Sequence, residues 1–344
     1  MQIHAGSNWK THKSIHALSL DEGAQQLAPL GRVRYVQLEP GAANVEGAIA
    51  ELGRTVVCRC GADRNRIEHI DTVPGRITLF VPVRGTGRIG TTSLASDCAV
   101  WARRGTRLIT FLDRHFLGVS ISVDAQRLQS TAADLHLKLP VGDSEICVLH
   151  LPAARVATID RLVQEMLALP GAEPNTAAAN ARVAVMEGAV VHLIATLLGN
   201  HPPRQNTAKE STSRIRAVVR ARDFVDSNLD QPLSLAKICQ ASYASPRALE
   251  YGFREAFALS PMAYVRCARL SRVRHELFLA EPRPKAVTQL AMKWGFWHLG
   301  QFSRDYRAFF GELPSETLAR TSERVGCMIP MRETDRPGSF TALS

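Results

Sequence analysis

The pattern of apolar and polar positions divides the chain into a β-rich first part and a helical remainder. Short runs rich in Val, Ile, Leu and Phe recur early in the chain, and Gly, Pro and Asp separate them. The runs are Arg32–Leu38, Arg54–Cys60, Arg76–Val81, Gly87–Leu94, Arg107–Leu112 and Phe116–Val123. Many short strands between turn residues are typical of an antiparallel barrel or sandwich. We therefore predict an α+β protein with a β-rich N-terminal domain and an all-α C-terminal domain.

Two amphipathic helices are predicted after the strands. Apolar residues recur at steps of three and four at Ile159, Leu162, Met166 and Leu169, and again at Val183, Met186, Val190, Leu193 and Leu197. Each series places an apolar stripe on one helix face. The stripes can pack on the β domain or on each other, or they can form a short coiled-coil seam between two copies. Both alternatives stay open, and we expect a homodimer through Ile159–Leu197.

A polar segment with two adjacent prolines, Gly199–Ser213, cannot contribute to a core, and helical periodicity resumes after it. We place the domain boundary there. The predicted organisation is a sensor or dimerisation domain at 1–198, a linker at 199–213, a helical domain at 214–321 and a tail at 322–344.

The first motif in the helical domain spans Ser234–Phe257. Ser234 is positioned to cap a short helix, and Ser245 followed by Pro246 is positioned to begin a longer one. The longer helix buries Leu249, Phe253 and Phe257, and it leaves Arg247, Glu250, Tyr251 and Arg254 on its outer face. A short helix, a tight turn and a second helix with a polar face are typical of the helix-turn-helix, whose second helix enters the major groove of DNA.

The pattern recurs in Val287–Phe310, where Gly295 allows the turn. Phe302, Tyr306 and Phe310 form the buried stripe, and His298, Gln301, Arg304 and Arg307 lie outside it. Between the two motifs, Ser260–Ala280 predicts a helix about 30 Å long. Successive major grooves on one side of B-DNA are about 34–36 Å apart. One chain can therefore present both second helices to consecutive grooves, and the arginines of the connecting helix can contact phosphates or face solvent.

These residues resemble the DNA-binding domain of the AraC/XylS family over about Arg214–Arg320. The resemblance is densest in GFWHLGQFSRDYRAFFGELPSE, residues Gly295–Glu316. It implies a reader of double-stranded operator DNA with two helix-turn-helix units, 234–257 and 287–310. It also implies an N-terminal domain, loosely similar to a cupin-like barrel, that senses a small molecule or dimerises. RNA polymerase is a further candidate partner. An activator is one candidate role, and the sequence leaves activation and repression open.

Carried over by position, the base contacts of the first unit fall on Arg247, Glu250 and Tyr251. Those of the second unit fall on Leu299, Gly300, Gln301 and Arg304. Two departures from the family pattern matter. Glu250 is acidic, so it accepts from cytosine but repels phosphate. Leu299 and Gly300 offer no side-chain hydrogen bond, so the second unit is expected to position the protein more than it reads sequence.

The distribution of charge agrees with a polyanionic partner for the C-terminal part. Residues 201–344 hold 22 Lys and Arg against 14 Asp and Glu, whereas the preceding 200 residues hold 20 against 18. A basic module beside a near-neutral one suggests nucleic acid. A solvated basic surface is the alternative explanation.

The N-terminal domain presents no catalytic motif. A nucleophile elbow, a phosphate-binding glycine loop and a Cys-x-x-Cys pair are all missing from the sequence, so we expect no enzyme, no cofactor and no metal. The alternative function is a DNA-binding protein with an enzymatic or a redox- or metal-sensing N-terminal domain, for which Cys58 and Cys60 are the candidates. Four histidines, His69, His115, His136 and His150, stand alone. Arg59, Arg84 or Arg88 could hold an organic acid inside the barrel.

We expect a cytoplasmic protein without membrane contact. Its start shows no secretory signal, and no continuous apolar run approaches the length that crosses a bilayer.

The linker generates the first testable prediction. A fragment that begins near Ser211 should fold alone and keep specific DNA binding, because the segment before it cannot carry core contacts. Circular dichroism and a DNA-binding titration of the fragment beside the full chain check this. An unfolded fragment, or one that needs the N-terminal half to bind, would contradict the boundary.

Overall fold

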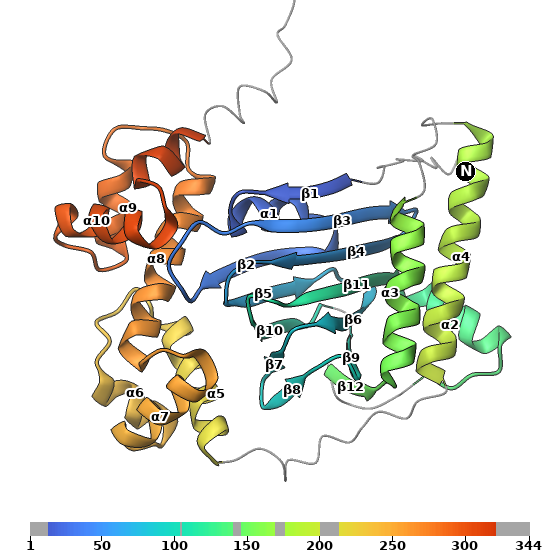
Figure 1. Cartoon of the computed structure of the whole chain (residues 1–344), viewed down its shortest axis with the longest axis horizontal. Helices are drawn as coiled ribbons and strands as arrows, with labels where there is room; N and C mark the ends of the chain where they lie inside the picture. Colours follow the sequence, from blue (N-terminus) through green and yellow to red (C-terminus); the bar gives the residue numbers. More distant parts are fainter. Residues whose placement is uncertain (1–12, 104, 140–145, 169–175, 200–212, 321–344) are drawn as a thin grey trace, which may run out of the picture.

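The computed structural model of the chain describes residues 13–103, 105–139, 146–168, 176–199 and 213–320. Two antiparallel sheets build the N-terminal domain (Figure 1). The seven-stranded sheet has the order β1-β3-β4-β11-β6-β9-β12, and the five-stranded sheet has the order β2-β5-β10-β7-β8. The strands are β1 (Lys13–Ala17), β2 (Gly31–Gln37), β3 (Val45–Leu52), β4 (Thr55–Ala62), β5 (Arg66–Thr72), β6 (Arg76–Arg84), β7 (Gly87–Ile89), β8 (Thr92–Leu94), β9 (Cys98–Ala102), β10 (Arg107–Leu112), β11 (Leu117–Asp124) and β12 (Ile146–His150). All six predicted strand regions are present, and the sequence analysis missed β1, β3, β5, β9 and β12.

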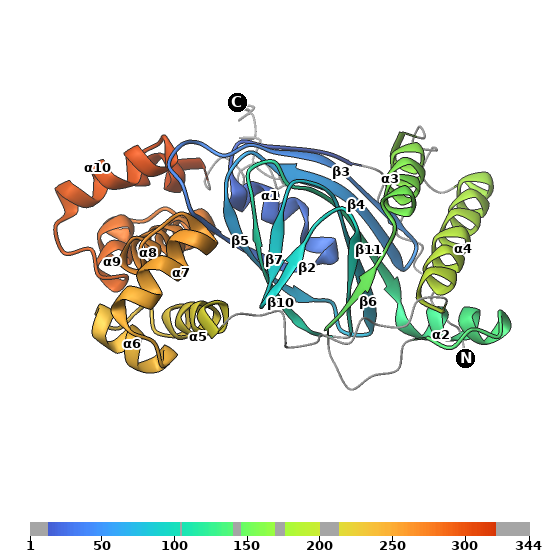
Figure 2. The ribbon, with the colours of Figure 1, turned by 60° about the horizontal axis from the view of Figure 1, so that its bottom comes forward.

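The two sheets face each other (Figure 2). Apolar side chains from both sheets pack between them. Tyr35 of β2 and Ile49 of β3 belong to one inner cluster. Leu108 of β10 and Val100 of β9 belong to a second. Side chains alternate along a strand, so Ile67 of β5 faces away from this interior and joins a core shared with the C-terminal domain. Both faces of the five-stranded sheet are therefore covered.

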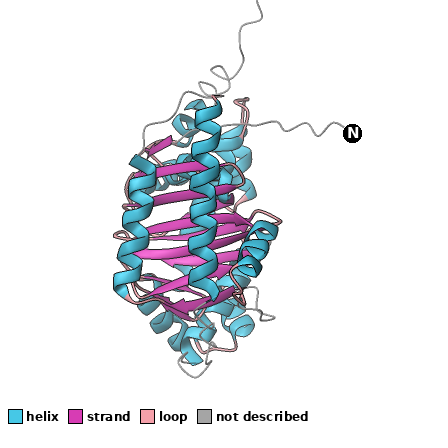
Figure 3. Ribbon diagram, turned by 90° about the vertical axis from the view of Figure 1, so that its right-hand side faces the viewer, coloured by secondary structure: helices cyan, strands magenta, loops and turns pink. Residues whose placement is uncertain are grey.

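Four helices accompany the sheets, namely α1 (Leu20–Gln26), α2 (Ala125–Asp134), α3 (Ala153–Ala168) and α4 (Ala177–Gly199). Helices α3 and α4 lie across the outer face of the seven-stranded sheet (Figure 3). Ile159 and Val190, from the two predicted stripes, are each 2% exposed and pack in this layer. Packing on the β domain is thus confirmed for Ile159 and Met166 of the first stripe and for all five positions of the second, whereas Leu162 is partly buried outside this cluster. Leu169 lies outside the described residues.

Partly buried ion pairs, each with a buried carboxylate, connect these helices to the sheet and to each other. Arg59 of β4 contacts Asp160 of α3 with 2.6 Å between Nε and Oδ1. Glu187 of α4 is 5% exposed; it accepts from the backbone N–H of Arg54 at 3.0 Å and pairs with Arg127 of α2. The expectation that Arg59 holds an effector inside the barrel is therefore wrong, because its side chain lies on the helix-covered face.

The C-terminal domain consists of α5 (Ser213–Ser227), α6 (Leu235–Ser242), α7 (Pro246–Phe257), α8 (Pro261–Leu279), α9 (Ala286–Lys293), α10 (Leu299–Phe310) and a final helix at 314–320. Helix α8 runs between α6–α7 and α9–α10 (Figure 1). The predicted caps are present: the side chain of Ser234 accepts from the backbone of Lys237, and that of Ser245 accepts from Ala248. Both helix-turn-helix units are confirmed within one or two residues of their predicted bounds. The linker at 200–212 and the tail lie outside the described residues.

Helix α4 is also long and apolar enough to cross a membrane by length and composition, which the sequence analysis did not anticipate. The core helix of a globular domain passes the same test. Val191 and Ile194 of α4 are each 1% exposed against the sheet, which is the environment of such a core helix.

The packing of α4 generates the second prediction. Val190→Asp should lower the free energy of unfolding by at least about 3 kcal/mol, because it buries a charge without a partner. Val185→Asp is the matched control on the same helix, since Val185 is 72% exposed, and it should change stability little. Thermal and urea melts compare the two. Equal stability of both variants would contradict the packing of α4 on the sheet.

Candidate nucleic-acid interface

The outer face of α7 carries the residues that the sequence predicts to contact bases in the first unit, and we call it the reading face of that unit. Leu249 and Phe253 are fully buried, which turns Arg247 and Tyr251 toward solvent. The guanidinium of Arg247 lies 5.7 Å from the centre of the Tyr251 ring. An arginine stacked on an aromatic ring is partly ordered before it meets a ligand. The guanidinium of Arg247 is therefore partly ordered by the Tyr251 ring.

The acidic residue on this face has a partner on its own helix. Arg254 Nε lies 3.8 Å from Glu250 Oε2, one helical turn away. Such an exposed pair contributes little to stability. It does offset the charge of Glu250, so repulsion of phosphate is weaker than the sequence alone indicates.

The reading face of the second unit is ordered by a chain of polar contacts on α10. Arg304 Nη2 donates to Gln301 Oε1 at 3.0 Å, and Gln301 Nε2 donates to Asp305 Oδ1 at 2.7 Å. Asp305 in turn pairs with Arg266 of α8 at 2.6 Å. Arg266 thus acts through Asp305 to position Gln301 and Arg304. The remaining predicted residues of this unit, His298, Leu299 and Arg307, are exposed.

Two exposed aromatic residues were not singled out from the sequence. Trp297, just before α10, is 68% exposed, and Tyr243, in the turn of the first unit, is 86% exposed with a backbone φ of 54°. Arg220 lies 5.7 Å from the Tyr243 ring. A large apolar side chain beside Leu299 can contact thymine methyl groups, which needs no hydrogen bond. The positions of Trp297 and Tyr243, directly beside the second helix of each unit, were the signal by which the sequence could have identified them.

Structural contacts hold Arg269 and Arg274, so phosphate contact and plain solvation are both wrong for these two arginines of α8, whereas neither interpretation is tested for Arg266 and Arg272. Arg266 pairs with Asp305, and Arg269 donates to the backbone carbonyls of Leu229 and Gln231. Arg274 is 5% exposed. Arg272 faces a pocket between the two domains. Helix α8 has neighbours on several sides, which the sequence pattern did not reveal.

Both reading units contact the N-terminal domain. Phe111 of β10 packs edge-on against Phe257 at the end of α7, with ring centres 5.6 Å apart. At the other unit, the backbone N–H of Gly41 donates to the carbonyl of Phe309 in α10 at 2.9 Å. The backbone N–H of Gln37 donates to Ser271 of α8 at 3.2 Å. The N-terminal domain therefore contributes to the relative placement of the two units.

A buried arginine joins three elements at this junction. Arg274 Nε lies 3.1 Å from Asp21 Oδ2 of α1, and Arg274 Nη1 lies 2.7 Å from Glu312 Oε1, which follows α10. Its guanidinium also lies 4.7 Å from the centre of the Phe310 ring. Removing one partner of a buried pair leaves an uncompensated charge. This contact therefore ties the second unit to the N-terminal domain.

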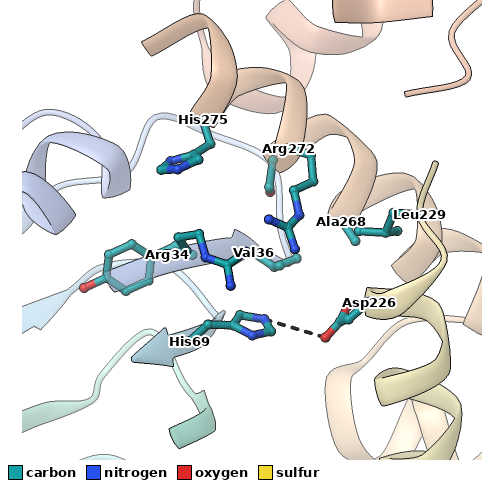
Figure 4. Close-up of a pocket in the computed structure, with 10 residues that line it drawn as sticks. Arg34, Val36, His69, Asp226, Leu229, Ala268, Arg272 and His275 are labelled. Atoms are coloured by element: carbon teal, nitrogen blue, oxygen red, sulfur yellow. Dashed lines mark ion pairs between the residues drawn. The ribbon is translucent and has the colours of Figure 1, made fainter. Parts of the chain in front are cut away.

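A second buried contact joins β5 to α5. His69 Nε2 lies 3.6 Å from Asp226 Oδ2, and Asp226 Oδ1 accepts from the hydroxyl of Tyr264 at 2.8 Å (Figure 4). Burial, with help from nearby arginines, lowers the pKa of His69 to about 3. Burial raises the pKa of Asp226 to about 6. At neutral pH a neutral imidazole therefore faces a carboxylate, and the contact is not a charged pair.

The described residues contain no group of three or more His, Cys, Asp and Glu side chains that could hold a metal ion. Cys58 and Cys60 lie side by side, as their spacing predicts, and Cys58 is fully buried. A hydrogen bond to Cys60 and burial raise the pKa of the Cys58 thiol. A thiol whose pKa is raised by burial is a poor nucleophile.

Comparison with known proteins places the similarity in this domain. Residues 238–320 match a family described as a helix-turn-helix domain. The chain is 35% identical over 98 residues to the probable thc operon regulatory protein of Rhodococcus erythropolis, covering 28% of this chain and 30% of the relative. It is 32% identical over 133 residues to XylDLEGF operon transcriptional activator 1 of Pseudomonas putida, covering 39% of each. The chain thus spans well under half the length of these relatives.

Among solved structures, the chain is similar to a probable AraC family transcriptional regulator from Rhodopseudomonas palustris CGA009. The identity is 36%, the match covers 30% of this chain and 96% of that one, and the TM-score is 0.28.

The contact between His69 and Asp226 generates the third prediction, on pH dependence. The pKa of Asp226 is raised, so its contribution to stability is full below about pH 4 and is lost as pH rises through about 6. The pKa of His69 is lowered, so its contribution is lost as pH falls from 6.5 toward 3. Between about pH 4 and 6, the contributions of Asp226 and His69 therefore change the free energy of unfolding in opposite directions as pH rises.

Single substitutions should therefore reveal the pH dependence of stability that each residue contributes. Relative to wild type, Asp226→Asn should gain stability as pH rises from about 4 to 6, and His69→Gln should gain stability as pH falls over that range. Each change should be on the order of 1–3 kcal/mol. Urea melts at a series of pH values measure both. Parallel profiles for the three proteins would contradict the assigned protonation states.

Proposed function

Since the C-terminal domain of this chain belongs to the AraC/XylS family of helix-turn-helix regulators, we propose that the protein is a sequence-specific DNA-binding transcription regulator. The observation that carries the proposal is the tandem of two exposed reading faces, on α7 and α10, held by the shared helix α8. The basic C-terminal part supports a polyanionic partner. The matched relatives are themselves operon regulators by name.

We propose base contacts from Arg247, Glu250 and Tyr251 in the first unit and from Gln301 and Arg304 in the second. Arg254, His298, Leu299 and Arg307 complete the DNA-facing set. Trp297 is added on the strength of its exposure. We also propose that 1–198 and 214–321 are separate modules joined by 199–213.

The N-terminal domain is proposed to bind a small-molecule effector and to act without enzymatic chemistry, in a cytoplasmic protein that activates transcription with RNA polymerase. A homodimer remains part of the proposal. Because the apolar stripes of α3 and α4 pack on the sheet, the seam would lie outside these stripes. A dimer doubles the number of reading units and so increases specificity for a long operator.

The fourth prediction concerns base reading. Arginine can hold guanine O6 and N7 with two hydrogen bonds, and each such pair discriminates by about 1–3 kcal/mol. Arg247→Ala and Arg304→Ala should therefore each relax the preference at one base pair, at positions separated by about 10–10.5 bp within the site. Selection of bound sequences from a randomised DNA library, at two salt concentrations, measures the preference and the salt slope.

Arg161→Ala is the control, because Arg161 is an exposed arginine on α3, on the far side of the molecule from α7 and α10 (Figure 1). It should leave both the preferred sequence and the salt slope unchanged. An arginine that touches only phosphate would lower affinity for all sequences alike. If neither Arg247→Ala nor Arg304→Ala altered the preferred sequence, base reading would not lie on α7 and α10.

A further inference from the structure

A cleft of about 570 Å³ lies between the two domains. The N-terminal domain contributes α1 and the outer face of β2, and the C-terminal domain contributes the end of α8. A smaller pocket shares Arg34, Arg272 and His275 with this cleft, and it ends at His69 and Asp226 (Figure 4). The cleft is therefore lined by residues that are more than two hundred positions apart in the chain.

The negative charges of this cleft are already paired. Asp71 lies 2.7 Å from Arg107, and Asp21 lies 3.1 Å from both Arg274 and His275. Asp226 lines only the smaller pocket, where it accepts from Tyr264. The cleft thus holds no carboxylate, among the described residues that line it, that lacks a basic partner.

The positive charges are in excess. Arg32, Arg34 and Arg272 line the cleft, and within the described part of the chain none of them has a carboxylate within 4 Å. Arg34 and Arg272 are half-buried and point into the same space between β2 and α8 (Figure 4). Burial and then the charge of Arg272 lower the pKa of Arg34. Two like charges that face each other across an interface oppose its closure unless an anion lies between them.

We propose that this cleft binds a small anionic ligand, a carboxylate or a phosphate ester, with its oxyanion held between Arg34 and Arg272. The planar guanidinium fork suits both kinds of oxyanion, because it can donate two parallel hydrogen bonds. The cleft can also accommodate an apolar part of the ligand. Phe278 and Leu279 line the outer part of the cleft, and Leu279 is 65% exposed.

The position of this site gives the ligand a means of acting on DNA binding. Arg34 belongs to the N-terminal domain and Arg272 to α8, so an anion that pairs with both favours the docked arrangement of the two domains. Helix α8 also carries both reading units. This consequence rests on the proposed regulator function, whereas binding of the anion does not.

The test measures binding to the full chain without DNA, so its result is independent of the proposed DNA-binding function. Isothermal calorimetry with inorganic phosphate and with hexanoate supplies the two probes. Wild type should bind at least one of them. Arg34→Gln and Arg272→Gln should each weaken its Kd by about tenfold or more, as expected for loss of one charge-assisted hydrogen bond. Arg161→Gln, on α3, should bind like wild type.

A preference for hexanoate over phosphate would identify a carboxylate ligand, and the reverse would identify a phosphate ester. Wild type that binds neither probe would overturn the proposal. Binding that survives both glutamine substitutions unchanged would also overturn it, because the anion would then sit elsewhere.

A charge-reversal variant provides a second readout that does not depend on the choice of probe. Arg272→Glu places a carboxylate opposite Arg34 and so imitates the bound anion. It should raise the Tm of the unliganded chain and abolish its response to the probe. The double variant Arg34→Glu with Arg272→Glu places two negative charges opposite each other, so its Tm should not show the increase expected for the single variant. Equal Tm values for the single and double variants would contradict the facing arrangement of the two side chains.

Discussion

The burial of helix α8 is the constraint on which the rest of the structure depends. Tyr264, Ala268, Val273 and Leu277 are each fully buried, and the helix contacts the first unit, the second unit and the five-stranded sheet. An element with three partners cannot shift against one of them without disturbing the others, because a packed interior does not deform continuously. The geometry of the two reading faces is therefore linked to the N-terminal domain.

Buried polar groups add specificity to this junction. Arg274 has both of its carboxylate partners only when α1 and the segment after α10 are in place, since Asp21 and Glu312 supply them. Asp226 is placed by Tyr264 and faces His69 across the domain boundary. Such contacts cost free energy to desolvate, and their value lies in excluding other arrangements. These contacts therefore specify one arrangement of the two domains, and that arrangement depends on the charges of the groups involved.

This combination suits a regulator. The excess positive charge at Arg34 and Arg272 lies where the two domains meet, so an anion there changes the balance between docked and undocked arrangements. The reading faces on α7 and α10 lie apart from this cleft, and none of their predicted residues lines it. Effector and DNA would then act on one helix from different sides. A two-state element biased by both ligands is the physical requirement for coupling between sites.

The sequence by itself determined the elements that depend on local signals. The two helix-turn-helix units follow from caps at Ser234 and Ser245 and from apolar residues at helical spacing, which work within a few residues of chain. Strand β5 was missed because its alternate residues face two different cores, so Glu68 and His69 are both buried and no apolar alternation remains. The convergence of Arg34 and Arg272 was also beyond the sequence. Only the packing of α8 on β2 brings them together, because long-range contacts leave no periodic trace in either segment.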